Sequence, residues 1–405
     1  MQYFFFGSRV ADLDHTVPVI YSLLEAGISS NNIKYMEIFP RLELKSIEND
    51  FRLKIINDKN VFFNQNIIGK KYLNIELFFN NTSLNNNFIT RIIIKSIKYF
   101  MNLLVKLFYK IRLFVIIYFT NEATIIVDHS NKYFYKYLIF LALKKKFKII
   151  GLPHGMVLHN GYIDNKIHKI MYEKTSPLNT FVQLVFCNKH DLFLASQNNQ
   201  SLLKTKILGS IRFSKEWTQV LKINLPIQKK KNNSKIKILI FEEKTGENIN
   251  NKFIPWVNLV ELTKVLDHLK KLDNCELTIC NHPSKYKKDF KDANIKYLNS
   301  TETTFQAVLK SDIVIGCVTS SLLDPLVLNK RILSLSHCHY FKSLIDVIEP
   351  NMVTNSYEDF KNKLKELIDH IDNGHIHKFQ DNLYKEFINN SNQNIFRLYS
   401  NLIIK

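Results

Sequence analysis

Residues 311 to 335 have the sequence SDIVIGCVTSSLLDPLVLNKRILSL, which predicts a strand, a polar turn, a helix and a second strand. The apolar run at 312–316 is typical of a short buried strand, and residues 322–328 form an apolar helical run. The second strand is expected at 331–335. Two strands joined through a helix are the repeating unit of α/β domains with parallel sheets. This stretch therefore predicts the α/β class.

The polar turn consists of Thr319, Ser320 and Ser321. A turn of hydroxyl residues at the start of a helix offers unpaired backbone N–H groups, side-chain donors and the positive end of the helix dipole. These features suit a phosphate group. The alternative is a simple N-cap, since Ser and Thr commonly begin helices.

The composition indicates a globular protein that binds an anionic partner. The chain has 405 residues, of which 46% are hydrophobic and 23% charged, so it can bury a sizeable core and is long enough for two domains. Its formal net charge of +20 favours a nucleotide, a nucleic acid or a membrane surface. Much of this charge is Lys scattered among Asn and Ile, so charge alone does not choose among these partners.

The cysteines and the first residues predict a cytoplasmic protein. The five cysteines are an odd number and form no C-x-x-C pair, which fits a reducing compartment better than a disulfide scaffold. The chain begins without a basic segment and reaches Gly7 and Asp12 too early for a signal peptide.

Alternating strands and helices predict two Rossmann-like domains with a cleft between them. The first domain is expected at 1–223 and the second at 236–380, and the polar, Lys-rich stretch 224–235 is typical of a linker. We expect the helix in 381–405 to cross back towards the first domain. The strands are expected at 2–6, 33–39, 124–127, 148–152, 184–188, 206–209, 236–241 and 275–280. Further helices are expected at 17–26, 255–272, 304–309 and 357–371.

Residues 88–119 predict one long helix that is strongly apolar except for a single polar stripe. The stripe consists of Lys95, Lys98, Asn102, Lys106 and Lys110. It argues against a simple membrane span. A basic amphipathic helix can lie on an anionic bilayer; alternatively, the helix packs on its own domain and presents a solvated Lys face.

Glycine is scarce, with 10 in the whole chain, so its positions are informative. Several glycines fall at or just after expected strand ends, where a ligand or a tight turn requires a missing Cβ. These are Gly7, Gly155, Gly209, Gly246 and Gly316. A structural turn would explain any one of them, but corresponding positions in two halves favour an interdomain cleft.

Candidates for proton transfer lie on two loops of the first domain. His154 follows the strand expected at 148–152, and a histidine there can act as a general base near neutral pH. Asp14 and His15 lie on the first loop and could supply or orient the same proton transfer. Each residue alone is equally compatible with a structural role.

Candidates for donor binding lie in the second domain. Lys244 follows its first strand and suits a phosphate, with Thr245 and Gly246 beside it. His282 and Pro283 follow a buried-looking strand, and the proline would hold that loop stiff beside an imidazole. We expect no metal site, since adjacent residues such as His337-Cys338-His339 rarely chelate one ion well.

Four motifs together resemble GT-B glycosyltransferases of bacterial surface polysaccharide synthesis. They are PHG at 153–155, GSIRF at 209–213, HP at 282–283 and DIVIG..TSSLLDPLVLNKRIL at 312–333. The similar proteins include capsule and lipopolysaccharide transferases, and polysialyltransferase-like and CDP-glycerol glycerophosphotransferase-like proteins. The resemblance covers most of the chain after residue 124 and, loosely, residues 1–39.

The resemblance implies that His282 and Pro283 contact a nucleotide, often CMP or CDP, and that Thr319, Ser320 and Ser321 hold its phosphate. His154 with Gly155 resembles the acceptor-side loop of the family, and Gly7 and Arg212 are placed in the cleft. The sequence lacks the tryptophan-containing form of that loop and a clear acidic-acidic-glycine motif. The catalytic base is therefore left open among His154, Asp14 and His15.

The expected function is transfer of a sugar, without a metal or cofactor, from a CMP- or CDP-linked donor, or a UDP-linked one, to a hydroxyl of a surface glycan. Expected partners are this donor, a glycan or lipid-linked glycan acceptor and an anionic membrane surface, which gives a peripheral position on the inner face of the cytoplasmic membrane. The alternatives are a CDP-glycerol-type polyol-phosphate transferase, a non-hydrolysing UDP-N-acetylglucosamine 2-epimerase and a basic nucleic-acid binder. No aromatic-interleaved basic motif or recognition helix favours a specific nucleic acid.

Overall fold

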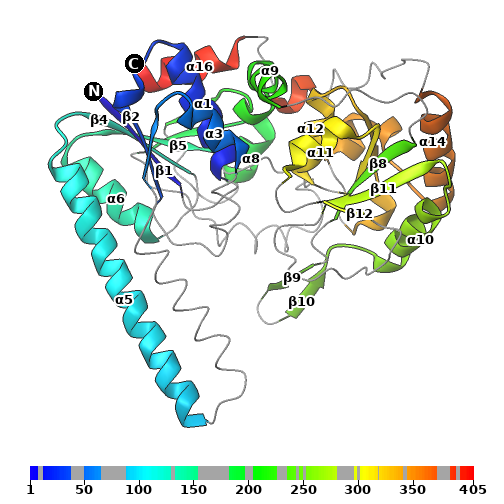
Figure 1. The fold of residues 1–405 in the computed structure, drawn as a ribbon, viewed down its shortest axis with the longest axis horizontal. Helices are drawn as coiled ribbons and strands as arrows, with labels where there is room; N and C mark the ends of the chain where they lie inside the picture. Colours follow the sequence, from blue (N-terminus) through cyan, green and yellow to red (C-terminus); the bar gives the residue numbers. More distant parts are fainter. Residues whose placement is uncertain are drawn as a thin grey trace.

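The fold contains two separate parallel sheets with helices on their faces (Figure 1). This computed structural model describes residues 1–7, 12–37, 50–64, 88–128, 133–153, 182–196, 204–225, 235–242, 246–249, 252–280, 296–298, 302–317, 319–340, 344–371, 384–388 and 393–405. The linker expected at 224–235 lies mostly outside these residues.

The first sheet has seven strands in the order β3-β2-β1-β4-β5-β6-β7, and all its pairings are parallel. The strand order reverses between β1 and β4, which makes this pair the topological switch point of the sheet. The strands are β1 Gln2–Gly7, β2 Ile33–Glu37, β3 Phe62–Asn64, β4 Ala123–Asp128, β5 Lys148–Leu152, β6 Gln183–Phe186 and β7 Thr205–Ile207.

Both faces of this sheet are buried, which is why its strands are apolar runs without strict alternation. Along β1 the side chains point to opposite faces in turn, so Tyr3 and Phe5 join one apolar core and Phe4 and Phe6 join another. The helices of this half are α1 Leu13–Glu25, α3 Phe51–Asn57, α5 Phe88–Tyr118, α6 Tyr133–Lys144, α8 Lys189–Ser196, α9 Lys215–Asn224 and α16 Ile395–Ile404, with short turns η2 Ser30–Asn32 and η4 Ile211–Phe213.

The second sheet has five parallel strands in the order β12-β11-β8-β13-β14, and its switch point lies between β8 and β13. Its strands are β8 Ile236–Phe241, β11 Cys275–Cys280, β12 Lys296–Tyr297, β13 Ile313–Gly316 and β14 Arg331–Ser334. The helical elements are α10 Leu259–Lys270, α11 Thr304–Lys310, η5 Ser320–Leu322, α12 Leu323–Val327, η6 Ser336–Cys338, α13 Leu344–Ile348, η7 Pro350–Met352 and α14 Tyr357–Asp369.

Two expected helices of this half differ from those observed. The helix expected from residue 255 begins at Leu259, because Lys252–Pro255 forms β10, which pairs antiparallel with β9 at Gly246–Ile249. The helix expected at 322–328 is divided into the 3₁₀ turn η5 and the five-residue α12. The expected tail helix is also shorter: α16 covers Ile395–Ile404, and Tyr384–Ile388 forms a separate helical turn.

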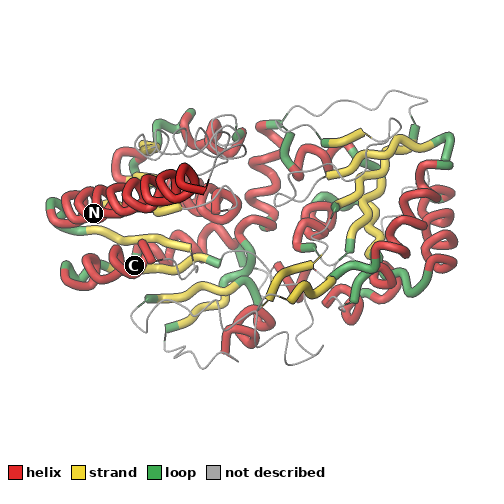
Figure 2. The backbone as a smooth tube through the Cα atoms, turned by 90° about the horizontal axis from the view of Figure 1, so that it is seen from below, coloured by secondary structure: helices red, strands yellow, loops and turns green. Residues whose placement is uncertain are grey.

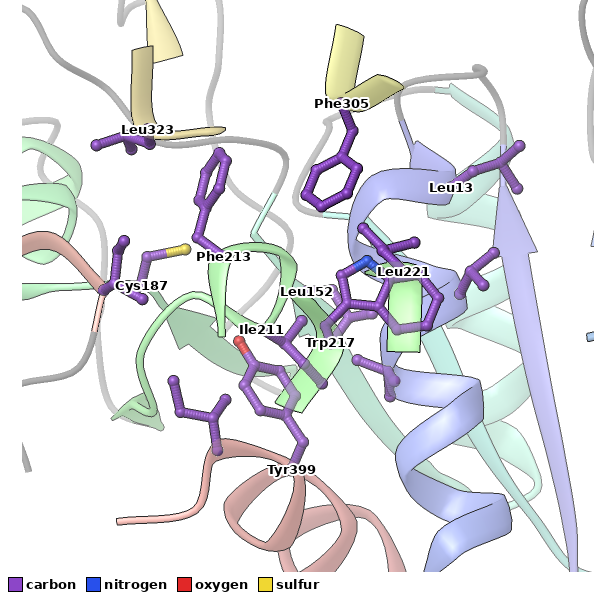
Figure 3. Close-up of a cluster of buried hydrophobic side chains, with 14 of the residues drawn as sticks. Leu13, Leu152, Cys187, Ile211, Phe213, Trp217, Leu221, Phe305, Leu323 and Tyr399 are labelled. Carbon is purple, nitrogen blue, oxygen red and sulfur yellow. The ribbon is translucent and has the colours of Figure 1, made fainter. Parts of the chain in front are cut away.

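One apolar core continues from the first sheet into the second half (Figure 3). Ile211, Phe213 and Trp217 of the first half belong to the same buried cluster as Phe305 and Leu323 of the second. The two sheets are therefore joined by packed side chains.

The last helix, α16, packs against α1 at the other end of the sequence (Figure 1). The two ends of the chain accordingly lie on the same half of the molecule (Figure 2). The ring centroids of Phe396 and Tyr21 are 6.1 Å apart, and the buried Tyr399 hydroxyl donates to the Gly209 carbonyl at 3.0 Å. The chain thus ends on the half in which it begins.

Candidate functional site

The second switch point, between β8 and β13, is the best-defined candidate site, because the turn of Thr319, Ser320 and Ser321 follows β13. We call this turn the hydroxyl turn. In parallel α/β sheets, ligands bind outside the carboxyl ends of the strands at the switch point. Here those ends are Phe241 of β8 and Gly316 of β13, and the turn at 319–321 begins three residues after Gly316. A Cβ placed on Gly316 would lie 3.3 Å from Leu322 and 3.4 Å from Phe241, so glycine allows this close packing.

The hydroxyls of the turn have different roles. Thr319 is the N-cap of η5, and its side chain accepts a hydrogen bond from the backbone N–H of Ser321 at 3.3 Å. Ser320 and Ser321 are half-buried, and within the described residues their side-chain oxygens make no hydrogen bond. Thr319 therefore acts as a helix cap, whereas no described residue forms a hydrogen bond with the hydroxyls of Ser320 and Ser321. Because α12 has only five residues, its dipole adds little to phosphate binding.

A cluster of charged side chains joins α12 to the first half. Arg212 of η4 contacts Asp14 of α1 at 2.8 Å with Nη1 and Asp324 of α12 at 3.0 Å with Nη2. Arg52 of α3 also pairs with Asp14, and its Nη2 lies 2.5 Å from Oδ2 of Asp50. We call these five residues the interdomain ion cluster. It connects α12, which follows the hydroxyl turn, to α1 and α3 of the first half.

Burial dominates the electrostatics of this cluster. It raises the pKa of the Asp324 carboxyl, an effect that Arg212 and Arg52 oppose. It raises the pKa of Asp50 to about 6, against the backbone N–H groups of Arg52 and Leu53. Burial also lowers the pKa of the Arg52 guanidinium to about 9, and the nearby Arg212 lowers it further. Charges held in this way cost desolvation energy, so losing one partner leaves another charge buried and unpaired.

The structure gives different surroundings to the three candidates for proton transfer, Asp14, His15 and His154. Asp14 and His15 lie in α1, which begins at Leu13, and not on the loop expected there. Each carboxylate oxygen of Asp14 pairs with a guanidinium group, Oδ1 with Arg52 and Oδ2 with Arg212, so neither oxygen is free to take a proton from an acceptor. The side chain of His15 is buried, with 3% of the residue exposed, which keeps it away from an acceptor in solution. The third candidate, His154, lies outside the described residues together with Gly155, but β5 ends at Leu152, two residues earlier.

Three donor-side segments follow neighbouring strands of the second sheet. Lys244 and Thr245, and His282 and Pro283, lie outside the described residues, after β8 and β11 respectively. The strands β11, β8 and β13 are adjacent and parallel, so their carboxyl ends lie at one edge of the sheet. The three donor-side segments follow these ends.

Local packing explains two more of the predicted glycines, Gly7 and Gly209. A Cβ on Gly7 would lie 1.8 Å from the Tyr35 hydroxyl, and one on Gly209 would lie 2.4 Å from the Ile388 carbonyl oxygen. Gly209 also has a φ of +86°, a conformation that favours glycine. Gly246 begins β9, in register with Pro255 of β10, and is not in a loop after β8.

Sequence reasoning missed Asp50, Arg52 and Asp324. Asp324 gives one sequence signal, since it is a charged residue inside the apolar run LLDPLV, where burial requires a partner. Asp50 and Arg52 lie in a stretch with no periodic pattern, so their role depends on the tertiary contact with Asp14. Within the described residues, no group of three His, Cys, Asp or Glu side chains could hold a metal ion.

Comparison with known proteins identifies the architecture. The sequence matches no known family model and no curated protein. Its structure is similar over 100% of the chain to S. aureus MnaA in a co-structure with UDP, with a TM-score of 0.55, 11% identity and 95% of that chain covered. The chain has the GT-B fold.

Two further structures share this fold. The glycotransferase of kitacinnamycin gives a TM-score of 0.53 at 8% identity, covering 99% of this chain and 98% of that one. The wall teichoic acid polymerase TagF gives 0.51 at 12% identity, covering 100% and 88%. At such low identity the likeness concerns the fold: two Rossmann-like domains, each with a parallel sheet.

Proposed function

We propose that this protein is a glycosyltransferase that moves a sugar from a nucleotide-activated donor to a hydroxyl of a bacterial surface glycan or lipid-linked glycan. The observation that carries the proposal is the position of Ser320 and Ser321, whose hydroxyls follow the switch-point strand β13 in a GT-B fold. Serine hydroxyls and backbone N–H groups there suit the phosphate of a donor. CMP- and CDP-linked donors are favoured by the resemblance of the sequence motifs, and UDP-linked donors remain in the proposal.

In the proposed reaction, the acceptor oxygen forms a bond to the anomeric carbon while the bond from that carbon to the donor phosphate breaks. His154 takes the acceptor proton. Lys244 and the hydroxyl turn stabilise the charge on the nucleotide that leaves, and His282 with Pro283 holds the nucleotide. The interdomain ion cluster contributes by fixing α12, and with it the turn, against the first half.

For its location we propose the cytoplasm, at the inner face of the cytoplasmic membrane. The five cysteines are free, which fits a reducing compartment. The net charge of +20 favours an anionic surface.

Calorimetric titration with CMP, CDP and UDP tests the proposal. We expect the parent protein to bind at least one of them, and Ser320→Ala to weaken binding by about tenfold, the effect of a lost hydrogen bond to a charged group. Ser96→Ala, at an exposed position of α5, is the matched control and should bind like the parent. Absence of nucleotide binding by the parent would reject the proposal.

Two other reactions are supported by particular structural similarities. A non-hydrolysing UDP-N-acetylglucosamine 2-epimerase is supported by the likeness to a putative UDP-N-acetylglucosamine 2-epimerase from Listeria monocytogenes, with a TM-score of 0.54 at 9% identity. A polyol-phosphate transferase is supported by the likeness to the wall teichoic acid polymerase TagF. An epimerase converts UDP-N-acetylglucosamine with no acceptor, whereas both transferases require one. Incubation with this nucleotide alone, and then with CDP-glycerol and a glycan acceptor, separates the three.

A further inference from the structure

Among the described residues of helix α5, Phe88–Tyr118, the buried side chains lie near its C-terminal end. Tyr109, Leu113 and Ile117 are buried in the apolar core beside α6. Among the described side chains between 92 and 108, none is buried. At 1.5 Å per residue the helix is about 46 Å long, and in Figure 1 it extends well beyond the first sheet.

Most of the exposed side chains described on α5 are apolar. Most of the large exposed hydrophobic side chains in the described part of the chain lie on this helix. Eight of them recur at alternating spacings of three and four, which places them on one face: Ile93, Ile97, Phe100, Leu104, Leu107, Ile111, Phe114 and Tyr118. Further exposed apolar residues widen this face: Ile92, Tyr99, Leu103, Phe108 and Val115. We call these thirteen residues the α5 apolar face.

Three of the charged residues described on α5 lie at the edges of this face, and a fourth, Lys95, is exposed on the same side as Lys106. Lys106 and Lys110 are one turn apart along one edge, and Arg112 lies two residues later on the opposite edge. These three side chains are only half-exposed, whereas Phe100 is 57% and Leu107 54% exposed. The segment 88–118 contains no Asp or Glu. Large apolar side chains of α5 are thus more exposed to water than these three charged ones. This distribution indicates that the helix contacts an apolar environment.

The surface continues onto the end of α6. The Lys145 ammonium donates to the Tyr118 carbonyl at 3.0 Å, and that of Lys144 lies 4.5 Å from the centroid of the Phe140 ring. Phe140 is itself 50% exposed. Exposed aromatic rings next to lysines suit the boundary between headgroups and acyl chains.

We propose that α5 docks this protein on an anionic lipid bilayer, lying in the plane of the surface with the α5 apolar face inserted. The basic edges would contact lipid phosphates, and this charge complementarity selects the bilayer over a second copy of the chain. Two α5 helices packed along their apolar faces would bring basic edges together, with no acidic residue to pair them. Within the described residues, no helix combines the length and hydrophobicity of a membrane span, which is consistent with a surface position. This inference does not depend on the proposed transfer reaction.

Vesicle flotation with the full chain tests the inference. We expect binding to vesicles of phosphatidylcholine mixed with phosphatidylglycerol, and weaker binding to phosphatidylcholine alone. The double variant Phe100→Glu, Leu107→Glu should lower the partition coefficient at least tenfold, since charged side chains oppose insertion. Lys106→Gln, Lys110→Gln should lower it by roughly fivefold per charge on the anionic vesicles only. Val260→Glu, at a 67% exposed position of α10, is the matched control and should bind like the parent.

The Phe100→Trp variant gives a second readout, because a tryptophan in the bilayer is quenched by brominated acyl chains. We expect quenching at position 100 and none for Val260→Trp, after subtraction of the parent signal. The proposal is overturned if the parent does not float with anionic vesicles, or if the double variant floats equally well. It is also overturned if sedimentation shows a dimer that Phe100→Glu, Leu107→Glu dissociates, since a second copy would then cover the helix.

Discussion

The domain interface and helix α5 depart from the usual distribution of polar and apolar residues in opposite ways. At the interface, charged side chains are withdrawn from water: the Asp324 side chain is 4% exposed and that of Arg212 18%. Along α5, apolar side chains are presented to water. Soluble proteins seldom bury charges without partners or expose broad apolar surfaces. The buried charges are paired within the molecule, whereas no described part of the chain covers the exposed apolar side chains of α5.

This difference predicts which substitutions change folding and which change binding. Residues of the interdomain ion cluster should affect stability in water, and residues of the α5 apolar face should hardly affect it. Three measurements on the isolated protein would sharpen or break this comparison.

The largest effect is expected for Arg212→Ala. It leaves the buried Asp324 carboxylate without its nearest cation, so the free energy of unfolding should fall by about 3 kcal/mol. Because Arg212 lowers the pKa of Asp324, that pKa should rise further in the variant, and the loss should be smaller at pH 5 than at pH 8. Urea unfolding at both pH values measures it.

The exposed Arg397 supplies the control for this substitution. Arg397→Ala, on α16, should change stability by less than about 0.5 kcal/mol at either pH. If Arg212→Ala were no more destabilising than this control, the ion cluster would not be holding the two halves together.

A smaller effect is expected from the titration of Asp50. Its pKa is about 6 in the folded protein and about 3.9 in an unfolded chain, so the folded state binds more protons between these values. Stability should therefore decrease by about 2 kcal/mol as the pH rises from 4 to 6. Asn retains the N-cap of α3 without titrating, so Asp50→Asn should flatten this part of the profile. Parallel profiles for the two proteins would contradict the assignment to Asp50.

The smallest effect is expected for Leu104→Ala on the α5 apolar face. Leu104 is 43% exposed, and its truncation should change the free energy of unfolding by less than about 0.5 kcal/mol in the absence of lipid. The matched control is Leu113→Ala on the same helix, where the residue is 4% exposed and the loss should be about 2 to 3 kcal/mol. Equal losses would mean that the face is covered in solution.

Much of the fold follows from local sequence signals. The strand at 236–241 and the long helix near 88–119 match β8 and α5 closely, because unbroken apolar runs and helical periodicity are local properties. The expected helix from residue 255 is wrong at its start, since the pairing of β10 with β9 is a contact that periodicity does not report. The sequence likewise did not predict the order of strands in either sheet.

The candidate site, like the fold, was predictable from the sequence only in part. The hydroxyl turn was recognisable because a strand, a polar turn and an apolar run follow each other directly in 311–335. The roles of Asp14 and Arg212 were not, because both depend on partners far away in the sequence: Asp14 meets Arg52, and Arg212 meets Asp324. Asp14 was predicted as a proton-transfer residue, and that role stays untested; its ion pairs argue for a structural one.

The sequence by itself determined the α/β class, the position of the hydroxyl turn and the apolar character of α5. Only the tertiary structure decided that the apolar side of this helix faces outward and that the lysines lie at its edges. The physical reason is that periodicity defines two faces of a helix but not which face the rest of the chain covers. The same holds at 311–335: the sequence defines a strand and a turn, and the strand order places that turn at a switch point.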